Sequence, residues 1–121
     1  MGDSNECQLN MPWFPRVLSP NSRGHWSEVA KAKKSYRELW YFLTKEAFAR
    51  KAVPGTYAQV HLTIEFYPPT KHKQDLDNML AAIKSGLDGL ADALNVNDEQ
   101  FTLTICKKPE IFGMIMVTVK W

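Results

Sequence analysis

Two acidic clusters about twenty residues apart hold the side chains best suited to chemistry in this 121-residue chain. The first is Asp75-Leu76-Asp77-Asn78, the second is Asn97-Asp98-Glu99, and the basic run Lys71-His72-Lys73 precedes both. Mg²⁺ prefers oxygen ligands and keeps several waters, so two or three carboxylates are enough to hold it. Cations beside such a site can bind phosphate. The pattern therefore predicts a magnesium site facing a phosphodiester, with Asp75, Asp77 and Asp98 as the metal ligands.

The spacing of Asp75 and Asp77 limits where they can lie. Side chains at i and i+2 point the same way in an extended chain, whereas inside a helix they point about 200° apart. We therefore expect Asp75 just before a helix and Asp77 in its first turn. In a purely structural interpretation, Asp75 is the helix N-cap and Asp77 complements the helix dipole. That interpretation does not account for the basic run or for Asp98.

Lys84 is the candidate for stabilising negative charge during cleavage or protonating the leaving oxygen. It lies two helical turns, roughly 10 Å, beyond Asp77 and on the same face of the expected helix, next to the core stripe. The alternative for Lys84 is an ion pair with Asp88 at i+4. If Lys84 has no catalytic role, Lys73 is the next candidate. The expected catalytic set is therefore Asp75, Asp77, Asp98 and Lys84.

The composition is that of an ordinary globular domain, because 45% of residues are hydrophobic and 23% are charged. We expect one domain over residues 1–121, with residues 1–8 flexible. A net charge of +2 does not by itself argue for nucleic acid. The clustering of cations is more informative, although a charged helix face is often only solvated. The candidates for DNA phosphate contact are Arg23, Lys31, Lys33, Lys34, Lys71 and Lys73.

Cys7 and Cys106 are far apart and have no nearby partner, so the sequence predicts neither a zinc site nor a disulfide framework. The N-terminal residues include acids and no long apolar run, so we expect no signal peptide and no membrane span. A reducing cytoplasmic compartment is the expected location.

Hydrophobic periodicity predicts six elements in the order β-α-β-α-β-β. The expected ranges are a strand at 9–13, a helix at 28–50 capped by Ser27, a strand at 60–66, a helix at 76–94, and strands at 101–107 and 114–121. Residues 109–113 are expected to connect the last two strands as a hairpin. The predicted class is α+β, with a small mixed four-stranded sheet packed by two long helices.

The expected core of the first helix is an apolar stripe at helical spacing. Its members are Val29, Ala32, Tyr36, Leu39, Trp40, Leu43 and Ala47. The last strand is apolar on both faces, with Ile115, Val117, Val119 and Trp121 on one face and Met114 and Met116 on the other. One face can pack on the helices, which leaves the other for a partner or for a helix of the same chain.

Several segments resemble the RusA family of Holliday junction resolvases, which bacteria and their phages encode. The central ones are Asp75-Leu76-Asp77-Asn78, the run Lys84-Ser85-Gly86-Leu87-Asp88-Gly89-Leu90, and Val96-Asn97-Asp98-Glu99-Gln100. Pro12-Trp13-Phe14-Pro15 and Leu18-Ser19-Pro20-Asn21 are similar to the opening of the family. The likeness extends from about residue 9 to residue 120.

The resemblance implies a homodimeric, Mg²⁺-dependent endonuclease that nicks four-way DNA junctions symmetrically in recombination and repair. Mn²⁺ is expected to substitute for Mg²⁺. The implied location is the cytoplasm of a bacterium or of a phage-infected or prophage-bearing cell. Asp75, Asp77 and Asp98 match the three catalytic, metal-binding aspartates of the family. The family's lysine usually stands four residues after the second aspartate, where this chain has Ala81, and Lys84 is three residues further on.

Two other functions stay open at this point. The first is a non-catalytic relative that binds branched DNA, with the shifted lysine as the reason for lost turnover. The second is a Mg²⁺-dependent phosphatase of the DxD type. In such phosphatases the first aspartate directly follows a buried parallel strand. Here residues 68–74 separate the expected strand from Asp75, which makes the phosphatase the weaker alternative.

Overall fold

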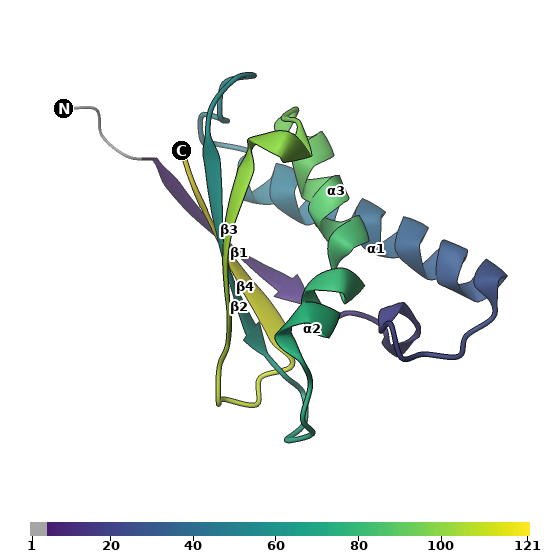
Figure 1. Cartoon of the computed structure of the whole chain (residues 1–121). Helices are drawn as coiled ribbons and strands as arrows, with labels where there is room; N and C mark the ends of the chain where they lie inside the picture. The colour runs from purple at the N-terminus through teal and green to yellow at the C-terminus, as the bar shows by residue number, and fades with distance from the viewer. Residues whose placement is uncertain (1–4) are drawn as a thin grey trace.

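The computed structural model describes residues 5–121, and Figure 1 shows a sheet with helices packed against it. The elements are β1 (Glu6–Pro12), η1 (Arg16–Leu18), α1 (Trp26–Ala47), β2 (Val60–Tyr67), α2 (Leu76–Ala82), α3 (Lys84–Leu94), η2 (Asp98–Gln100), β3 (Phe101–Lys107) and β4 (Met114–Lys120).

The four strands form one mixed sheet, as the sequence predicts, in the order β1-β4-β2-β3. β4 runs antiparallel to β1 and β2, whereas β2 and β3 run parallel. The predicted hairpin between β3 and β4 is wrong, because β2 lies between them. The connection crosses the end of β2, where the Lys108 N–H donates to the Phe66 carbonyl at 2.8 Å and the Gly113 N–H to the Pro68 carbonyl at 3.3 Å. The β2–β3 pair needs a long crossover, which α2 and α3 supply.

The helices cover one face of this sheet (Figure 1). β2 is central, and the side chains of Val60, Leu62, Ile64 and Phe66 are fully buried, which confirms the predicted alternation. Burying each such side chain contributes about 1.5–3 kcal/mol. The opposite face of β2 is more polar, and the two ring nitrogens of His61 there lie 2.6 and 2.9 Å from the hydroxyls of neighbouring threonines on β3.

The helix predicted over residues 76–94 is interrupted at Ile83, so residues 5–121 contain three α-helices and not two long ones. Ile83 has φ −98° and ψ 7°, and its N–H is shared between the carbonyls of Met79 and Leu80. Its side chain is fully buried. The sequence has no glycine or proline there, so its periodicity runs unbroken through the bend. Within residues 5–121 no helix has the length and apolarity needed to cross a membrane.

Two predicted starting points are also wrong. β1 begins at Glu6, so residues 6–8 belong to a strand and are not a flexible end, while residues 1–4 lie outside the described part of the chain. α1 is capped by the His25 side chain, which accepts a hydrogen bond from the Ser27 N–H at 3.2 Å, so Ser27 is not the cap. Leu39 is 41% exposed and lies outside the core stripe of α1.

α1 and α3 approach each other closely because α3 presents two buried glycines to α1. A Cβ atom at Gly86 would lie 2.5 Å from Cε2 of the fully buried Trp40. A Cβ atom at Gly89 would meet the main-chain carbonyl oxygen of Arg37, which cannot move aside as a flexible side chain can. These glycines therefore set the spacing of the helix layer.

We expect Gly89→Ala to lower the free energy of unfolding by at least about 1 kcal/mol, because overpacking a tight contact costs about 1–3 kcal/mol. Alanine's higher helix propensity offsets part of this loss. Gly55→Ala is the matched control, since nothing lies within 4 Å of the added Cβ atom. Urea denaturation of the three proteins measures the effect. Equal midpoints for Gly89→Ala and Gly55→Ala would contradict the close approach of the helices.

Candidate functional site

Asp75 and Asp77 lie at the N-terminal end of α2, as their spacing predicts. Asp75 is the N-cap residue, with extended backbone at φ −74° and ψ 140°, and Asp77 lies in the first turn. The carbonyl of Asp75 accepts the N–H of Met79 at 3.1 Å, but its carboxylate makes no capping hydrogen bond. Both aspartates are exposed. The backbone of Asp75 therefore fits the N-cap interpretation, because it begins the helix. Its carboxylate does not, because it makes no capping hydrogen bond.

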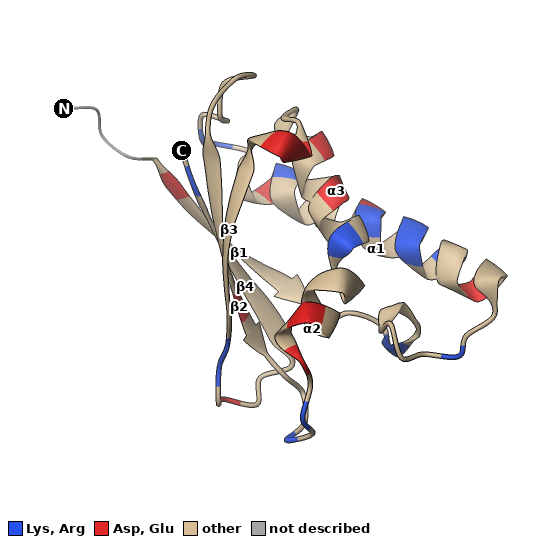
Figure 2. Ribbon diagram, viewed as in Figure 1, with Lys and Arg blue, Asp and Glu red and all other residues tan. Residues whose placement is uncertain are grey.

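A basic loop precedes the aspartates at the same end of the sheet (Figure 2). Lys71 and Lys73 are exposed, and Lys71 lines a cavity of about 240 Å³ with Lys107 and Lys108 from the end of β3. Lys108 also pairs with Glu65 at 3.2 Å, and the hydrogen bond and charge of that carboxylate raise the pKa of Lys108. Sequence reasoning did not include Lys107 and Lys108, because only the fold places them beside the loop. This end of the molecule combines two free carboxylates with several cations.

Asp98 lies in η2, a short helix with a well-defined start. The Gln100 side chain accepts from the Asn97 N–H at 2.9 Å, and the Asn97 side chain accepts from the Glu99 N–H at 3.4 Å. Gln100 also donates to the Ala58 carbonyl at 2.7 Å, which ties η2 to the segment before β2. The Asp98 carboxylate is exposed and takes no part in these bonds.

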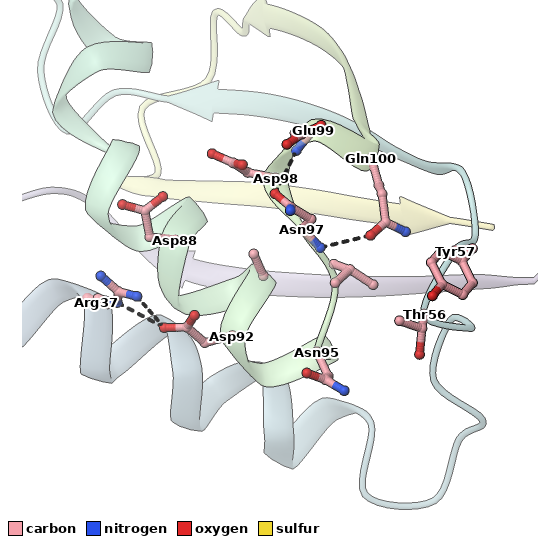
Figure 3. Close-up of a pocket in the computed structure, with 12 residues that line it drawn as sticks. Arg37, Thr56, Tyr57, Asp88, Asp92, Asn95, Asn97, Asp98, Glu99 and Gln100 are labelled. Carbon is pink, nitrogen blue, oxygen red and sulfur yellow. Dashed lines mark hydrogen bonds and ion pairs between the residues drawn. The ribbon is translucent and has the colours of Figure 1, made fainter.

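A cleft of about 670 Å³ lies beside η2 (Figure 3). Asp88 from α3 and Asp98 from η2 lie on one side of it, and Tyr57 and Asn95 lie on the other. Asp92 on its wall accepts from Arg37 Nε at 2.9 Å and from Nη2 at 2.6 Å. These hydrogen bonds, and then the charge of Asp92, raise the pKa of Arg37.

Sequence reasoning did not find the Arg37–Asp92 pair. The two residues are 55 positions apart, so no local pattern in the sequence indicates the pair. The pair is half-exposed, so it adds little to stability and mainly fixes the position of one carboxylate on the cleft wall.

The structure places Asp98 at the opposite end of the sheet from Asp75 and Asp77. η2 leads into β3 at Phe101, which pairs with Val60, the first residue of β2, whereas Asp75 follows the last residue of β2. α2 and α3, of 7 and 11 residues, carry the chain from one end to the other. Among residues 5–121 no three His, Cys, Asp or Glu side chains are close enough to hold one ion. One chain therefore does not bring the three aspartates together.

Lys84 lies at the first residue of α3, directly after the bend at Ile83. Its predicted alternative, an ion pair with Asp88, does not form in the described part of the chain. Lys84 lines a cavity of about 200 Å³ with Lys33 of α1, Asp88 and Ser85. The Ser85 Oγ is buried and has no hydrogen-bond partner. The bend thus creates a small site that combines two cations, a free hydroxyl and one carboxylate.

The remaining predicted DNA contacts lie at the start of α1 and before it. Lys31, Lys33 and Lys34 are exposed on α1 (Figure 2). Arg23 is exposed before the helix and lines a cavity of about 730 Å³ with Arg16 and Glu28. Lys34, also on α1, lines a separate hollow with Arg37 and Phe42. The cations therefore line several separate hollows, and Lys33 is the α1 lysine that shares a cavity with Lys84.

Comparison with known proteins adds a relative. No family model matches the chain. A protein of Xylella fastidiosa (strain Temecula1), whose name is "Uncharacterized protein", is 36% identical over 113 residues. This chain belongs to the family of that protein. The match spans 92% of this chain and 74% of the Xylella fastidiosa protein. The relative's name states no activity, so the function is proposed from this chain's own residues.

Proposed function

We propose that the protein is a Mg²⁺-dependent endonuclease of the RusA type that nicks four-way DNA junctions. The observation that carries the proposal is the pair of free carboxylates at the start of α2. Asp75 occupies the N-cap position without capping, and Asp77 is exposed in the next turn. Within residues 5–121 neither aspartate forms an ion pair. Two unused carboxylates beside a lysine-rich loop are better explained by a bound cation and phosphate than by stability.

The two carboxylates fit Mg²⁺, which commonly binds through one or two protein carboxylates, several waters and substrate phosphate oxygens. Mn²⁺ has similar ligand preferences and should substitute. When bound, such an ion lowers the pKa of a coordinated water and neutralises charge on the phosphate. Asp75 and Asp77 would hold it at the end of α2, with Asp98 as the third ligand that the resemblance implies.

The chain's cations would hold and orient the DNA. Lys71 and Lys73 are exposed in the loop before the aspartates and would bind the phosphates next to the scissile bond. Arg23 and Lys33 would bind phosphates farther along the strand, and Lys31 and Lys34 would add to the attraction at a distance. Each such contact contributes to affinity without selecting sequence.

Lys84 would place a positive charge near the reacting phosphate. It is exposed, is not paired with Asp88 and lies next to the buried Ser85 hydroxyl. An unpaired ammonium group can stabilise charge that develops on the phosphate oxygens. Because Lys84 follows the bend at Ile83, its side chain would point in a different direction from the one it would have in the unbroken helix that the sequence predicts.

A branched-DNA-binding protein without turnover is the second candidate. It is favoured by the separation of Asp98 from Asp75 and Asp77 within one chain. A phosphatase of the DxD type stays the weaker alternative, because seven residues separate the end of β2 from Asp75. Its aspartate would have to follow the strand directly. Cleavage of a labelled four-way junction with Mg²⁺ distinguishes the first two candidates.

We expect Asp77→Asn to reduce junction cleavage to background and to leave junction binding equal or tighter, because it removes a metal ligand and a negative charge near phosphate. Glu46→Gln is the matched control, since it makes the same carboxylate-to-amide change at an exposed position of α1. Cleavage is followed on a labelled junction with Mg²⁺ and binding by gel shift with EDTA. Wild-type cleavage by Asp77→Asn would show that the metal site is elsewhere.

We expect Lys84→Ala to lower the cleavage rate by on the order of a hundredfold with little change in binding, because it removes charge that stabilises the transition state. The free energy of unfolding should change by no more than about 0.5 kcal/mol, since Lys84 is exposed. Lys45→Ala, at an exposed position of α1, is the control. Single-turnover kinetics give the rate. A rate within twofold of wild type would move the role to another cation, with Lys73 tested next.

A further inference from the structure

An exposed aromatic side chain lies at the end of the sheet where β2 stops. Phe112, in the connection between β3 and β4, is 63% exposed. Its ring stacks on that of Tyr67, the last residue of β2, with the ring centroids 5.1 Å apart and the planes inclined by 29°. Because Tyr67 covers one face of the Phe112 ring, the exposed area belongs mainly to the other face. The chain therefore presents an open aromatic surface in a defined orientation.

The connection that carries Phe112 is fixed near both of its ends. The Lys108 N–H donates to the Phe66 carbonyl at 2.8 Å, and the Gly113 N–H donates to the Pro68 carbonyl at 3.3 Å. Gly113 has φ 66°, which lies in the left-handed region that glycine adopts without strain. A ring that is already held in place costs less conformational entropy when a ligand binds to it.

Free cations lie next to this aromatic surface. Ile111, the residue before the ring, lines the hollow of about 240 Å³ together with Lys71, Lys107 and Lys108. Glu65 holds the Lys108 ammonium group at 3.2 Å. Lys71 and Lys107 are exposed and form no ion pair within residues 5–121. Figure 2 shows these lysines at one end of the sheet, in the loop before α2 and at the end of β3.

An open aromatic ring beside free lysines is typical of sites that bind unpaired nucleotides. Every nucleobase has a face that can stack on the ring, and lysines bind the adjoining phosphates. In a continuous duplex the neighbouring base pairs cover these faces, so the ring can be used only by a base that has left the stack. A single exposed apolar side chain is common on protein surfaces and carries no function by itself. The neighbouring lysines favour a nucleic-acid ligand over an apolar one.

We propose that Phe112, supported by Tyr67, stacks on an unpaired base of the DNA, while the neighbouring lysines bind the flanking phosphates. The inference rests on the proposed function, because it assigns an unpaired base to that nuclease's substrate. The ring lies at the same end of the sheet as the free carboxylates, since Lys71 belongs to the loop that leads from β2 to Asp75. A branch point supplies such a base readily, because a base pair there lacks a stacked neighbour on one side.

Anisotropy measurements without Mg²⁺ test the ring, because binding is then separated from cleavage. We expect Phe112→Ala to bind a short oligothymidylate at least about fivefold more weakly than wild type, because one stacked base is lost. Phe112→Trp should restore binding, since an indole also has a stacking face. Phe42→Ala is the matched control, because Phe42 is 65% exposed and also contacts a tyrosine ring but lies on α1. Equal binding by Phe112→Ala and wild type, or an equal loss with Phe42→Ala or on an unbranched duplex, would overturn the proposal.

Photo-cross-linking tests the same contact in the wild-type protein. Iododeoxyuridine in a DNA strand cross-links to an aromatic ring on which it stacks, and peptide mapping identifies that ring. We expect the cross-link at Phe112 or Tyr67, both with a single strand and with a four-way junction substituted next to its branch point. A cross-link with the single strand alone would overturn the branch-point assignment. A cross-link at Tyr57 alone, near the opposite end of β2, would overturn the site.

The salt dependence of binding tests the role of the lysines. Lys107→Gln should reduce the slope of log K against log salt by about 0.7 on the oligothymidylate, because one phosphate contact is lost. Lys45→Gln, at an exposed position of α1, should leave the slope unchanged. An unchanged slope for Lys107→Gln would overturn its phosphate contact.

Nicking of a four-way junction with Mg²⁺ separates this inference from the proposed function. If wild type does not nick but its binding of the oligothymidylate depends on Phe112, the nuclease function fails and the base site stands. If wild type nicks and Phe112→Ala binds the oligothymidylate as wild type does, the base site fails and the nuclease function stands.

Discussion

The close packing of α1 on α3 is the contact on which the rest of the helix layer depends. Gly89 leaves no room for a side chain beside the main chain of α1, and Gly86 lies against the indole of Trp40. Because Trp40 is fully buried, this contact joins the helix layer to the core. It also sets the distance between Lys33 on α1 and Lys84 on α3, which share one small cavity. A change in helix spacing would therefore move the cations that the proposed reaction needs.

The parallel pair of β2 and β3 determines where the acidic groups lie. The crossover carries the chain from the end of β2 along α2 and α3 back to the start of β3. The aspartates that precede the crossover and the aspartate that follows it consequently lie at opposite ends of the sheet. Within residues 5–121, one chain therefore does not bring these three carboxylates together.

Sequence patterns correctly predicted the features that depend only on neighbouring residues in the chain. β2 was predicted correctly because Val60, Leu62, Ile64 and Phe66 alternate, and Asp75 because two carboxylates at i and i+2 need an extended first residue. The bend at Ile83 could not be predicted, since the residue is apolar and fits an unbroken helix. The hairpin between β3 and β4 was wrong because strand order depends on long-range pairing. For the same reason Lys107 and the Arg37–Asp92 pair, brought together only by the fold, were missed.

The claim at the centre of this account is that the start of α2 binds a divalent cation. Anomalous diffraction from crystals grown with Mn²⁺ tests it most directly, because the ion is located without any assay. We expect an anomalous peak about 2.1–2.2 Å from carboxylate oxygens of Asp75 and Asp77. No peak at these residues, or a peak only in the cleft beside Asp88 and Asp92, would contradict it.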